Sequence, residues 1–299
     1  MTSSPLADAR LVLAWGTVRA AAFPDRVAAA AAAGIPSIGL MIGDYLALRK
    51  AGWTDEELLD VLQQHDVTID EVEVLFGFAG PSGPANIPER PGLVYADAEA
   101  ELAAFHMGDV FGVRNVQTTG RFASPPTRSG TTDAFSSLCD RAAEHGMAVA
   151  LEFVPYTDIP DLAAAAQIVA DAGRPNGGLC VDSWHFFRGS ADFDALEAVD
   201  PAIIRMIQIN DGPVVPVDSN RAVDSVHHRR CPGEGEFDLA RWLAAMNRPG
   251  LAASVSVEVY SDELTRMSSA AAAQRAGAAT RDVIQRVIGG PRHAPVGTV

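Results

Sequence analysis

Short apolar runs alternate with alanine-rich segments along nearly the whole chain, and the alternation repeats eight times. Most of the runs are continuous in Val, Ile and Leu, which is typical of parallel strands that are covered on both faces. We predict eight strands, at Arg10–Val18, Ser37–Met41, Ile69–Phe78, Asn115–Thr119, Ala148–Val154, Gly178–His185, Ile204–Asp211 and Ala253–Tyr260.

The segments between these strands carry signals for the beginnings and ends of helices. Thr54 and Glu57 have the Thr-x-x-Glu spacing of a capping box. Asp238 is expected to cap a helix over Leu239–Met246, and Ser261 a long C-terminal helix that runs towards Val287. Glycines mark the predicted helix ends, because they accept the left-handed conformation there: Gly34, Gly146 and Gly173.

Eight strand–helix units in series predict an α/β protein with a single (β/α)8 barrel. A doubly wound sheet in two halves is the alternative. About 250 residues suffice for such a barrel, so we expect one domain over residues 1–299, with a frayed C-terminal tail from about residue 290.

Two connections are longer than the usual few residues. Ala79–Tyr95 follows the third predicted strand and Gly212–Glu236 follows the seventh. Both leave the carboxyl ends of strands, where barrel active sites form. Surface insertion without function is the alternative for each loop.

The overall charge excludes some classes of partner. Asp and Glu number 38 against 23 Lys and Arg, for a formal net charge of -15. Such a field repels nucleic acid and anionic membrane surfaces, so we expect neither as a partner. No spanning helix or secretory signal is expected, and three scattered cysteines (Cys139, Cys180 and Cys231) fit a reducing cytoplasm.

Oxygen-bearing side chains interrupt four consecutive apolar strands near their carboxyl ends. They are Glu152, Asp182, Gln208 and Glu258. Any one of them alone is explained by a salt bridge or a cap. Three carboxylates and an amide at one barrel mouth repel one another unless a cation lies between them, so together they predict a divalent metal site.

Other residues near the mouth are weaker candidates. Asn210 and Asp211 also suit a turn that ends a strand, and Glu73 is either an inward carboxylate or a salt-bridged wall. His185, three residues after Asp182, is a candidate catalyst.

The loop after the seventh strand holds the only local basic cluster of the chain, His227, His228, Arg229 and Arg230. One arginine could fold over the pocket and bind substrate oxygens, whereas a solvated loop is the simpler interpretation. Trp15, Phe76, Phe78 and Trp184 are plausible pocket walls, although core packing explains each of them equally well.

Several of these segments resemble the sugar phosphate isomerase/epimerase family of xylose-isomerase-like barrels. The resemblance rests on Leu-Glu152-Phe, Val-Asp182-Ser-Trp-His185, Gln208-Ile-Asn-Asp211, Arg230-Cys-Pro-Gly233-Glu-Gly235-Glu-Phe-Asp238 and Val-Glu258-Val. It is strongest from about residue 148 to 260. It implies that Glu152, Asp182, Gln208 and Glu258 bind one divalent ion, and that His185 and either Arg229 or Arg230 contact the substrate.

The resemblance implies a class of metal ion and a class of substrate, but no particular one of either. Many family members have His where this chain has Gln208, and an amide oxygen favours Mg²⁺ or Mn²⁺, with Co²⁺ possible and zinc less suited. The expected substrate is a keto sugar or related polyhydroxy ketone. Such barrels often pair, so a homodimer is possible.

The expected chemistry begins with removal of a proton next to a metal-bound carbonyl group. Glu152 and Glu258 on opposite sides of that carbon give isomerisation or epimerisation. A dehydratase of a cyclic polyol ketone, such as an inosose or 3-dehydroshikimate, is the first alternative, with His185 as the acid. A ligand-binding barrel without turnover is the second. The DNA-repair endonucleases of this fold hold several metals with many histidines, whereas this chain has 7.

Overall fold

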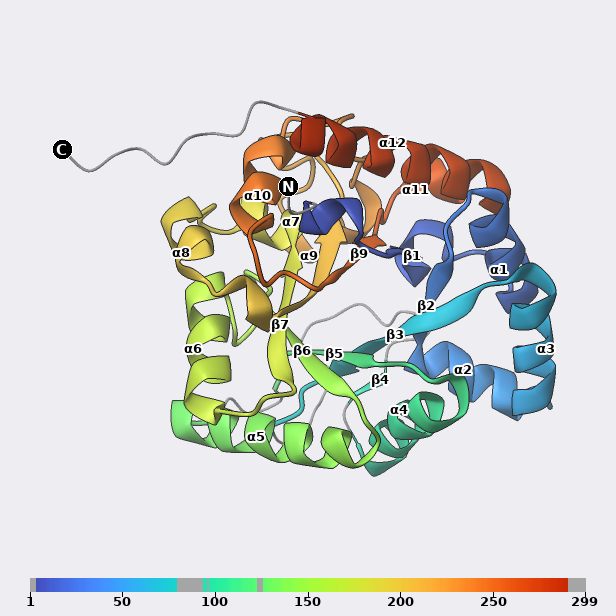
Figure 1. Ribbon diagram of the computed structural model, residues 1–299, viewed down its shortest axis with the longest axis horizontal. Coiled ribbons are helices and arrows are strands. Elements are labelled where there is room, and N and C mark those ends of the chain that lie inside the picture. Colours follow the sequence, from blue (N-terminus) through green and yellow to red (C-terminus); the bar gives the residue numbers. More distant parts are fainter. Residues whose placement is uncertain (1–3, 80–93, 96, 123–125, 290–299) are drawn as a thin grey trace.

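The chain forms a closed barrel of parallel strands surrounded by helices (Figure 1). The computed structural model describes residues 4–79, 94–95, 97–122 and 126–289. The strands are β1 (Leu11–Leu13), β2 (Ser37–Met41), β3 (Thr68–Phe76), β4 (Val94–Tyr95), β5 (Asn115–Thr119), β6 (Ala148–Glu152), β7 (Gly177–Asp182), β8 (Ile204–Ile209) and β9 (Ser254–Val257).

Closure of the ring decides between the two predicted architectures. The hydrogen-bonded order is β2-β1-β9-β8-β7-β6-β5-β3, and an additional pairing of β2 with β3 joins the two ends. Among the described residues, the short strand β4 pairs only with β3, outside this ring. The predicted (β/α)8 barrel is therefore confirmed, and the doubly wound sheet is excluded.

Helices cover the outside of the barrel, and α12 packs beside α1 and α10 (Figure 1). The helices are α1 (Phe23–Ala32), α2 (Ile42–Lys50), α3 (Asp55–His65), α4 (Ala98–Phe111), α5 (Arg128–Glu144), α6 (Leu162–Ala172), α7 (Ser183–Arg188), α8 (Phe193–Ala198), α9 (Arg221–His227), α10 (Leu239–Met246), α11 (Asp262–Thr265) and α12 (Ser269–Gly289). Short 3-10 helices cover Pro5–Ala7, Trp15–Val18 and Pro201–Ile203.

The predicted strands at Ser37–Met41 and Asn115–Thr119 have the observed bounds, but the others differ at their ends. The first predicted strand, Arg10–Val18, stops at Leu13 because the Trp15 N–H leaves the sheet and donates to Glu73 Oε1 at 3.0 Å. The sixth stops at Asp182, whose carboxylate accepts the Trp184 N–H at 2.7 Å and begins helix α7. His185 therefore lies in a helix and not in a strand.

Most of the predicted helix signals are confirmed. Thr54 and Glu57 form the reciprocal capping box of α3, and Asp238 caps α10 over the predicted residues. Gly34, Gly146 and Gly173 all have positive φ angles at helix ends. The prediction for Ser261 is wrong in extent: it caps only the short helix α11, because Ser268 Oγ accepts the Ala271 N–H and starts α12 anew.

Of the two long connections, the structure describes the one after β8. Most of the predicted loop Ala79–Tyr95, like the predicted tail from residue 290, falls outside the described residues. The loop after β8 contains helix α9 and returns through an antiparallel bridge between Asp211 and Arg230.

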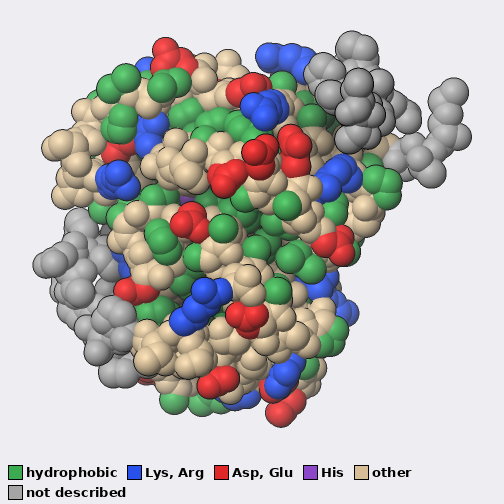
Figure 2. Space-filling model, turned by 90° about the vertical axis from the view of Figure 1, so that its left-hand side faces the viewer, with side chains coloured by type: hydrophobic (Ala, Val, Ile, Leu, Met, Phe, Trp, Pro, Cys, Tyr) green, Lys and Arg blue, Asp and Glu red, His purple; other side chains and the backbone are tan. Residues whose placement is uncertain are grey.

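The described surface carries both signs of charge. On the face in Figure 2, basic side chains lie scattered among acidic ones. None of the helices in the described residues is long and apolar enough to cross a membrane.

Candidate active site

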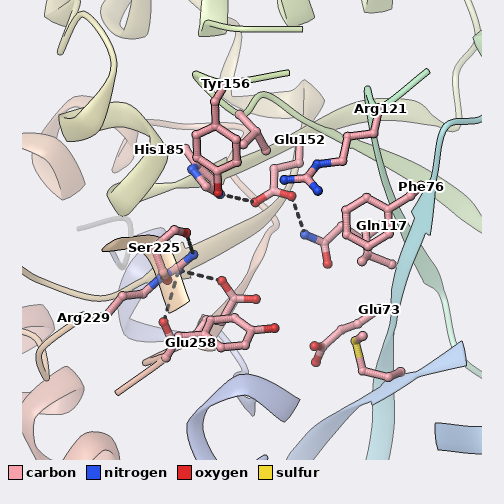
Figure 3. A pocket seen from close by; sticks show the side chains of 14 residues that line it. Glu73, Phe76, Gln117, Arg121, Glu152, Tyr156, His185, Ser225, Arg229 and Glu258 are labelled. Carbon is pink, nitrogen blue, oxygen red and sulfur yellow. Dashed lines mark hydrogen bonds and ion pairs between the residues drawn. The ribbon is translucent and has the colours of Figure 1, made fainter. Parts of the chain in front are cut away.

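A pocket opens at the carboxyl ends of the barrel strands (Figure 3). Its described lining mixes carboxylates, two arginines and aromatic rings. The lining residues are Met41, Glu73, Val74, Phe76, Gln117, Arg121, Glu152, Val154, Tyr156, His185, Ser225, Arg229, Glu258 and Tyr260. Charged groups buried in this way call for compensating partners.

A chain of side-chain hydrogen bonds runs from Glu152 at the end of β6 to Glu258 directly after β9. Gln117 Nε2 donates to Glu152 Oε2 at 3.0 Å and to Gln208 Oε1 at 3.3 Å. Gln208 Nε2 donates to Glu258 Oε1 at 3.0 Å, and the Cys180 thiol donates to Gln208 Oε1 at 3.1 Å. In this arrangement Gln208 presents its amide nitrogen to Glu258, so offering its oxygen to a cation requires the amide to turn over.

Asp182 and His185 complete the acidic side of the pocket. His185 Nε2 lies 3.4 Å from Glu152 Oε1 and 3.5 Å from Asp182 Oδ2. Asn210 Nδ2 donates to Asp182 Oδ1 at 2.8 Å, so Asn210 orients that carboxylate. One potential ligand atom from each of Glu152, Asp182 and His185 lies within 4.8 Å of the others, as in a metal site.

Arg229 is the arginine that folds over the pocket. Its Nη1 donates to Asp182 Oδ2 at 3.0 Å and to Glu258 Oε2 at 2.8 Å. Its remaining nitrogens donate to the carbonyl and hydroxyl oxygens of Ser225 in α9. This buried guanidinium supplies one positive charge among three carboxylates, which is less than they need.

The raised pKa values of the buried carboxyl groups reflect this shortage of positive charge. Burial raises the pKa of Glu152 well above its ordinary value, and the neighbouring Asp182 raises it further. Burial also raises the pKa of Glu258, to about 8, although Arg229 opposes the rise. A divalent cation at this point would restore the ionised forms, so the residues present fit such an ion.

Glu73 lies inside the barrel mouth as a further buried carboxyl group. It comes from β3 and lines the pocket opposite Glu152 (Figure 3). Burial raises its pKa well above the ordinary value, and Glu258 adds to the rise. A Cβ at Gly39 in β2 would overlap the Glu73 carboxyl group, so a side chain at that position would displace Glu73.

Asp211 proves to be a structural residue. Its carboxylate accepts the N–H groups of Gly212, Gly233 and Phe237 at 2.8 to 3.0 Å. Gly233 has a φ of +82°, and a Cβ at Gly235 would overlap Asp211. The loop therefore wraps around Asp211 at Gly233 and Gly235. This arrangement fixes the segment of the loop that carries Arg229.

Three predicted substrate-binding residues do not reach the described pocket lining. Arg230 is exposed and donates to the Glu234 carbonyl oxygen. Trp184 is buried beneath the site against Arg188 and Phe237. Trp15 packs in a cluster with Met41, Val226 and Tyr260, and its indole N–H donates to Asp44 at 2.6 Å.

The pocket also contains residues that were not predicted from the sequence. Gln117 carries the same signal as the predicted ligands, since it is a polar side chain inside an apolar strand. Arg121, Tyr156 and Ser225 lie in connections after strands, where no periodic pattern marks them. Of the suggested aromatic walls, Phe76 lines the pocket, whereas Phe78 packs against Phe122 and Phe135.

Comparison with known families identifies the class of protein. The family described as xylose isomerase-like TIM barrel matches residues 27–283, which is most of the chain. The chain therefore belongs to that family, as its residues suggested.

Individual relatives match only part of this chain. Inosose isomerase of Bacillus subtilis is 29% identical over 171 residues, which cover 56% of this chain and 60% of that protein. A 3-dehydroshikimate dehydratase of Pseudomonas aeruginosa is 30% identical over 132 residues, 44% of this chain and 20% of that enzyme. The chain thus matches less than two thirds of either relative.

Solved structures share the fold. The IolI protein, whose crystal structure holds a zinc atom, superposes with a TM-score of 0.78 at 22% identity, over 93% of this chain and 99% of that one. A D-allulose 3-epimerase from Methylomonas sp., in complex with D-allulose, superposes with a TM-score of 0.68 at 17% identity, over 93% and 97% of the two chains. At these identities the likeness establishes the barrel alone.

Proposed function

We propose that this protein is a divalent-metal-dependent isomerase or epimerase of a keto sugar or related polyhydroxy ketone. The observation that carries the proposal is a pair of carboxyl groups, Glu152 at the end of β6 and Glu258 directly after β9, which face one pocket and are joined by a chain of hydrogen bonds. The named activities of the inosose isomerase and D-allulose 3-epimerase relatives support the same substrate class.

The proposed ligands of the metal are Glu152, Asp182, Gln208 and Glu258, with His185 close enough to serve as a nitrogen donor. When bound, a divalent ion stabilises the negative charge that develops on the substrate carbonyl oxygen. The oxygen-rich set favours Mn²⁺ or Mg²⁺, with Co²⁺ possible. The zinc in IolI and the position of His185 keep zinc among the ions to be tested.

The protein's own residues handle the proton. Glu152 removes it from the carbon next to the carbonyl group, and Glu258, three strands further around the ring, returns one from the other side. Arg229 holds Asp182 and Glu258 in place through its two ion pairs. The net reaction either moves one C–H bond or inverts the configuration of one carbon atom.

A dehydratase of a cyclic polyol ketone is the second candidate. His185 favours it, because its Nε2 lies at the pocket, 3.4 Å from Glu152, where it can protonate a leaving hydroxyl group. The dehydratase relatives support this reading.

Incubation with candidate ketones in D₂O separates the two reactions. Isomerisation installs deuterium next to the carbonyl group, whereas dehydration produces an ultraviolet-absorbing enone. Metal analysis of protein purified without chelators is expected to find about one divalent ion per chain. Reproducible absence of metal, together with a melting temperature that Mn²⁺ does not change, would leave only a ligand-binding barrel without turnover.

Glu152→Gln is the first variant to test. We expect turnover to fall by about 100-fold or more, because the base is lost while the Gln117 contact can be kept. Circular dichroism should report an unchanged fold. Turnover at the wild-type rate would contradict the assignment of Glu152.

The cell location and assembly are also proposals. Three buried free cysteines support a reducing, cytoplasmic compartment. A homodimer, which is common among such barrels, is to be tested by light scattering.

A further inference from the structure

Asn210 lies directly after β8 and beside Asp182, and the proposed reaction gives it no part. It is fully buried, as are Asp182 and Ser183 at the end of β7. The two strands are parallel, with Asp182 opposite Gln208 in the register, so Asn210 and Asp182 lie at the same end of the barrel. Asn210 is outside the described pocket lining, and it therefore acts on the site through the residues that it contacts.

Ser183 fixes the direction of the Asn210 amide. The Asn210 backbone N–H donates to Ser183 Oγ at 2.9 Å, and the Ser183 hydroxyl group lies 2.8 Å from the Asn210 carbonyl oxygen and 3.1 Å from its Oδ1. Because a hydroxyl group donates its proton to an oxygen, Oδ1 of Asn210 faces Ser183. The amide nitrogen, Nδ2, is thereby turned towards the carboxylate of Asp182.

The two carboxylate oxygens of Asp182 have different surroundings. Oδ1 accepts Asn210 Nδ2 at 2.8 Å and the Trp184 N–H at 2.7 Å. Oδ2 lies among groups that line the pocket, 3.0 Å from Arg229 Nη1 and 3.5 Å from His185 Nε2. Two N–H donors therefore occupy Oδ1, and Oδ2 is the oxygen directed at the candidate metal site.

The number of oxygens that a carboxylate offers affects divalent ions differently. Ca²⁺ takes about six to eight oxygen ligands at about 2.3–2.6 Å, and it accepts carboxylates that bind through both oxygens. Smaller ions such as Mn²⁺ prefer an octahedral set of ligands. Two oxygens of one carboxylate fit an octahedron poorly, because they subtend much less than a right angle at the ion. A carboxylate that is held to one oxygen therefore favours the smaller ion.

We propose that Asn210 is a positioning residue that limits Asp182 to one metal-binding oxygen and thereby disfavours Ca²⁺ relative to Mn²⁺ at this site. The inference rests on the proposed function, since Asp182 is a proposed metal ligand there. Loss of the Asn210 amide would leave Oδ1 with the Trp184 N–H alone among these two donors. The carboxylate is then free to turn both oxygens towards the ion.

Metal titration of the chelator-treated protein tests this role without any substrate. Calorimetry with Mn²⁺ alone and with Ca²⁺ alone gives the two dissociation constants for the wild type and for Asn210→Ala. We expect Asn210→Ala to weaken Mn²⁺ binding by about 10-fold or more and Ca²⁺ binding by less than about 2-fold. In a crystal structure of the Mn²⁺-loaded wild type, Asp182 should bind the ion through Oδ2 alone.

Two further variants separate ion preference from general damage. Ser183→Ala removes the hydroxyl group that orients the amide, so it should lower the preference for Mn²⁺ in the same direction by a smaller factor. It decides the test if circular dichroism shows that Asn210→Ala does not fold.

Asn176→Ala is the matched control for the loss of a side-chain amide. The Asn176 amide donates to the carbonyl oxygens of Cys139 and Met147 at 2.7 and 3.0 Å. Asn176 directly precedes β7 and therefore lies at the opposite end of that strand from Asp182. Its replacement should change the affinity for neither ion.

Equal losses of affinity for both ions in Asn210→Ala, or no change for either ion, would overturn the inference, as would binding of Mn²⁺ by both Asp182 oxygens in the wild type. The proposed function fails separately, if Asn210→Ala shifts the ion preference but the Mn²⁺-loaded wild type turns over no candidate ketone. Turnover by a wild type whose ion preference does not depend on Asn210 would overturn the inference alone. A wild type that binds no Mn²⁺ would contradict both.

Discussion

Arg229 is the residue on which the ionisation of the site depends. It is buried and lies within 3.0 Å of both Asp182 and Glu258. Burial by itself lowers the pKa of an arginine, but the two carboxylates raise that of Arg229 above its ordinary value. Arg229 and the proposed metal ion therefore neutralise the same carboxylates, so removal of Arg229 is expected to make the stability of the protein depend more strongly on the metal.

Arg229→Met is expected to lower the free energy of unfolding of the metal-free protein by about 3 kcal/mol at pH 8, because two buried carboxylates lose their partner. Saturating Mn²⁺ should recover much of the loss. Urea unfolding in EDTA and in Mn²⁺ measures both effects.

Arg188→Met provides the matched comparison. Arg188 forms a buried ion pair with Asp224, at an N–O distance of 2.9 Å, and neither residue is a proposed metal ligand. Its loss of stability should not respond to the metal. A metal response of equal size in both variants would show that Arg229 has no special relation to the ion.

At the scale of elements, the approach of β2 to β3 sets the position of Glu73. Gly39 gives room to the Glu73 carboxyl group, which in turn accepts the Trp15 N–H where the chain leaves β1. The register between β2 and β3 shifts between Ile38 and Gly39, at the same level of the barrel. One glycine thus couples three neighbouring strands at the mouth.

Gly39→Ala is therefore expected to destabilise the protein by about 2 kcal/mol or more, since Glu73 must move and the Trp15 N–H loses its acceptor. In a Glu73→Ala background the same change should cost much less. Thermal and urea unfolding of the two single variants and the double variant measure this coupling. Additive effects would contradict the proposed contact.

At the scale of the whole molecule, Glu71 joins distant strands across the barrel interior. Its two carboxyl oxygens accept the hydroxyl groups of Ser254 and Ser256, at 2.6 and 2.7 Å, so β3 is tied to β9. Burial raises the pKa of Glu71 to about 7, although these hydroxyl groups lower it. Ionisation of this group therefore opposes folding.

The pH dependence of stability follows from the sign of that shift. Between pH 4.5 and 7 the folded chain holds a proton on Glu71 that the unfolded chain has lost, so stability falls as pH rises through this window. A rise from 4.5 to about 7 corresponds to about 3 kcal/mol.

Glu71→Gln should remove this contribution. Relative to wild type, the variant is expected to gain about 3 kcal/mol in unfolding free energy between pH 4.5 and pH 8, as measured by urea unfolding. Glu56→Gln, at an exposed position of α3, controls for the change in net charge. A difference that stays constant with pH would contradict the raised pKa of Glu71.

The sequence by itself determined the barrel, several helix caps and the positions of Glu152, Asp182, Gln208 and Glu258 at strand ends. These features depend on local periodicity and on the cost of a polar group within an apolar run, and both can be read along the chain. The same signal marks Gln117, which was not among the predicted ligands.

Only the tertiary structure decided which side chains meet. Ring closure and strand register bring β6 and β9 to one pocket, select Arg229 rather than Arg230, and leave Trp184 beneath the site. They also place Arg121 beside Phe76 and Tyr156, although these residues are far apart along the chain. Such convergence is decided by packing over long sequence distances, and no local pattern encodes it.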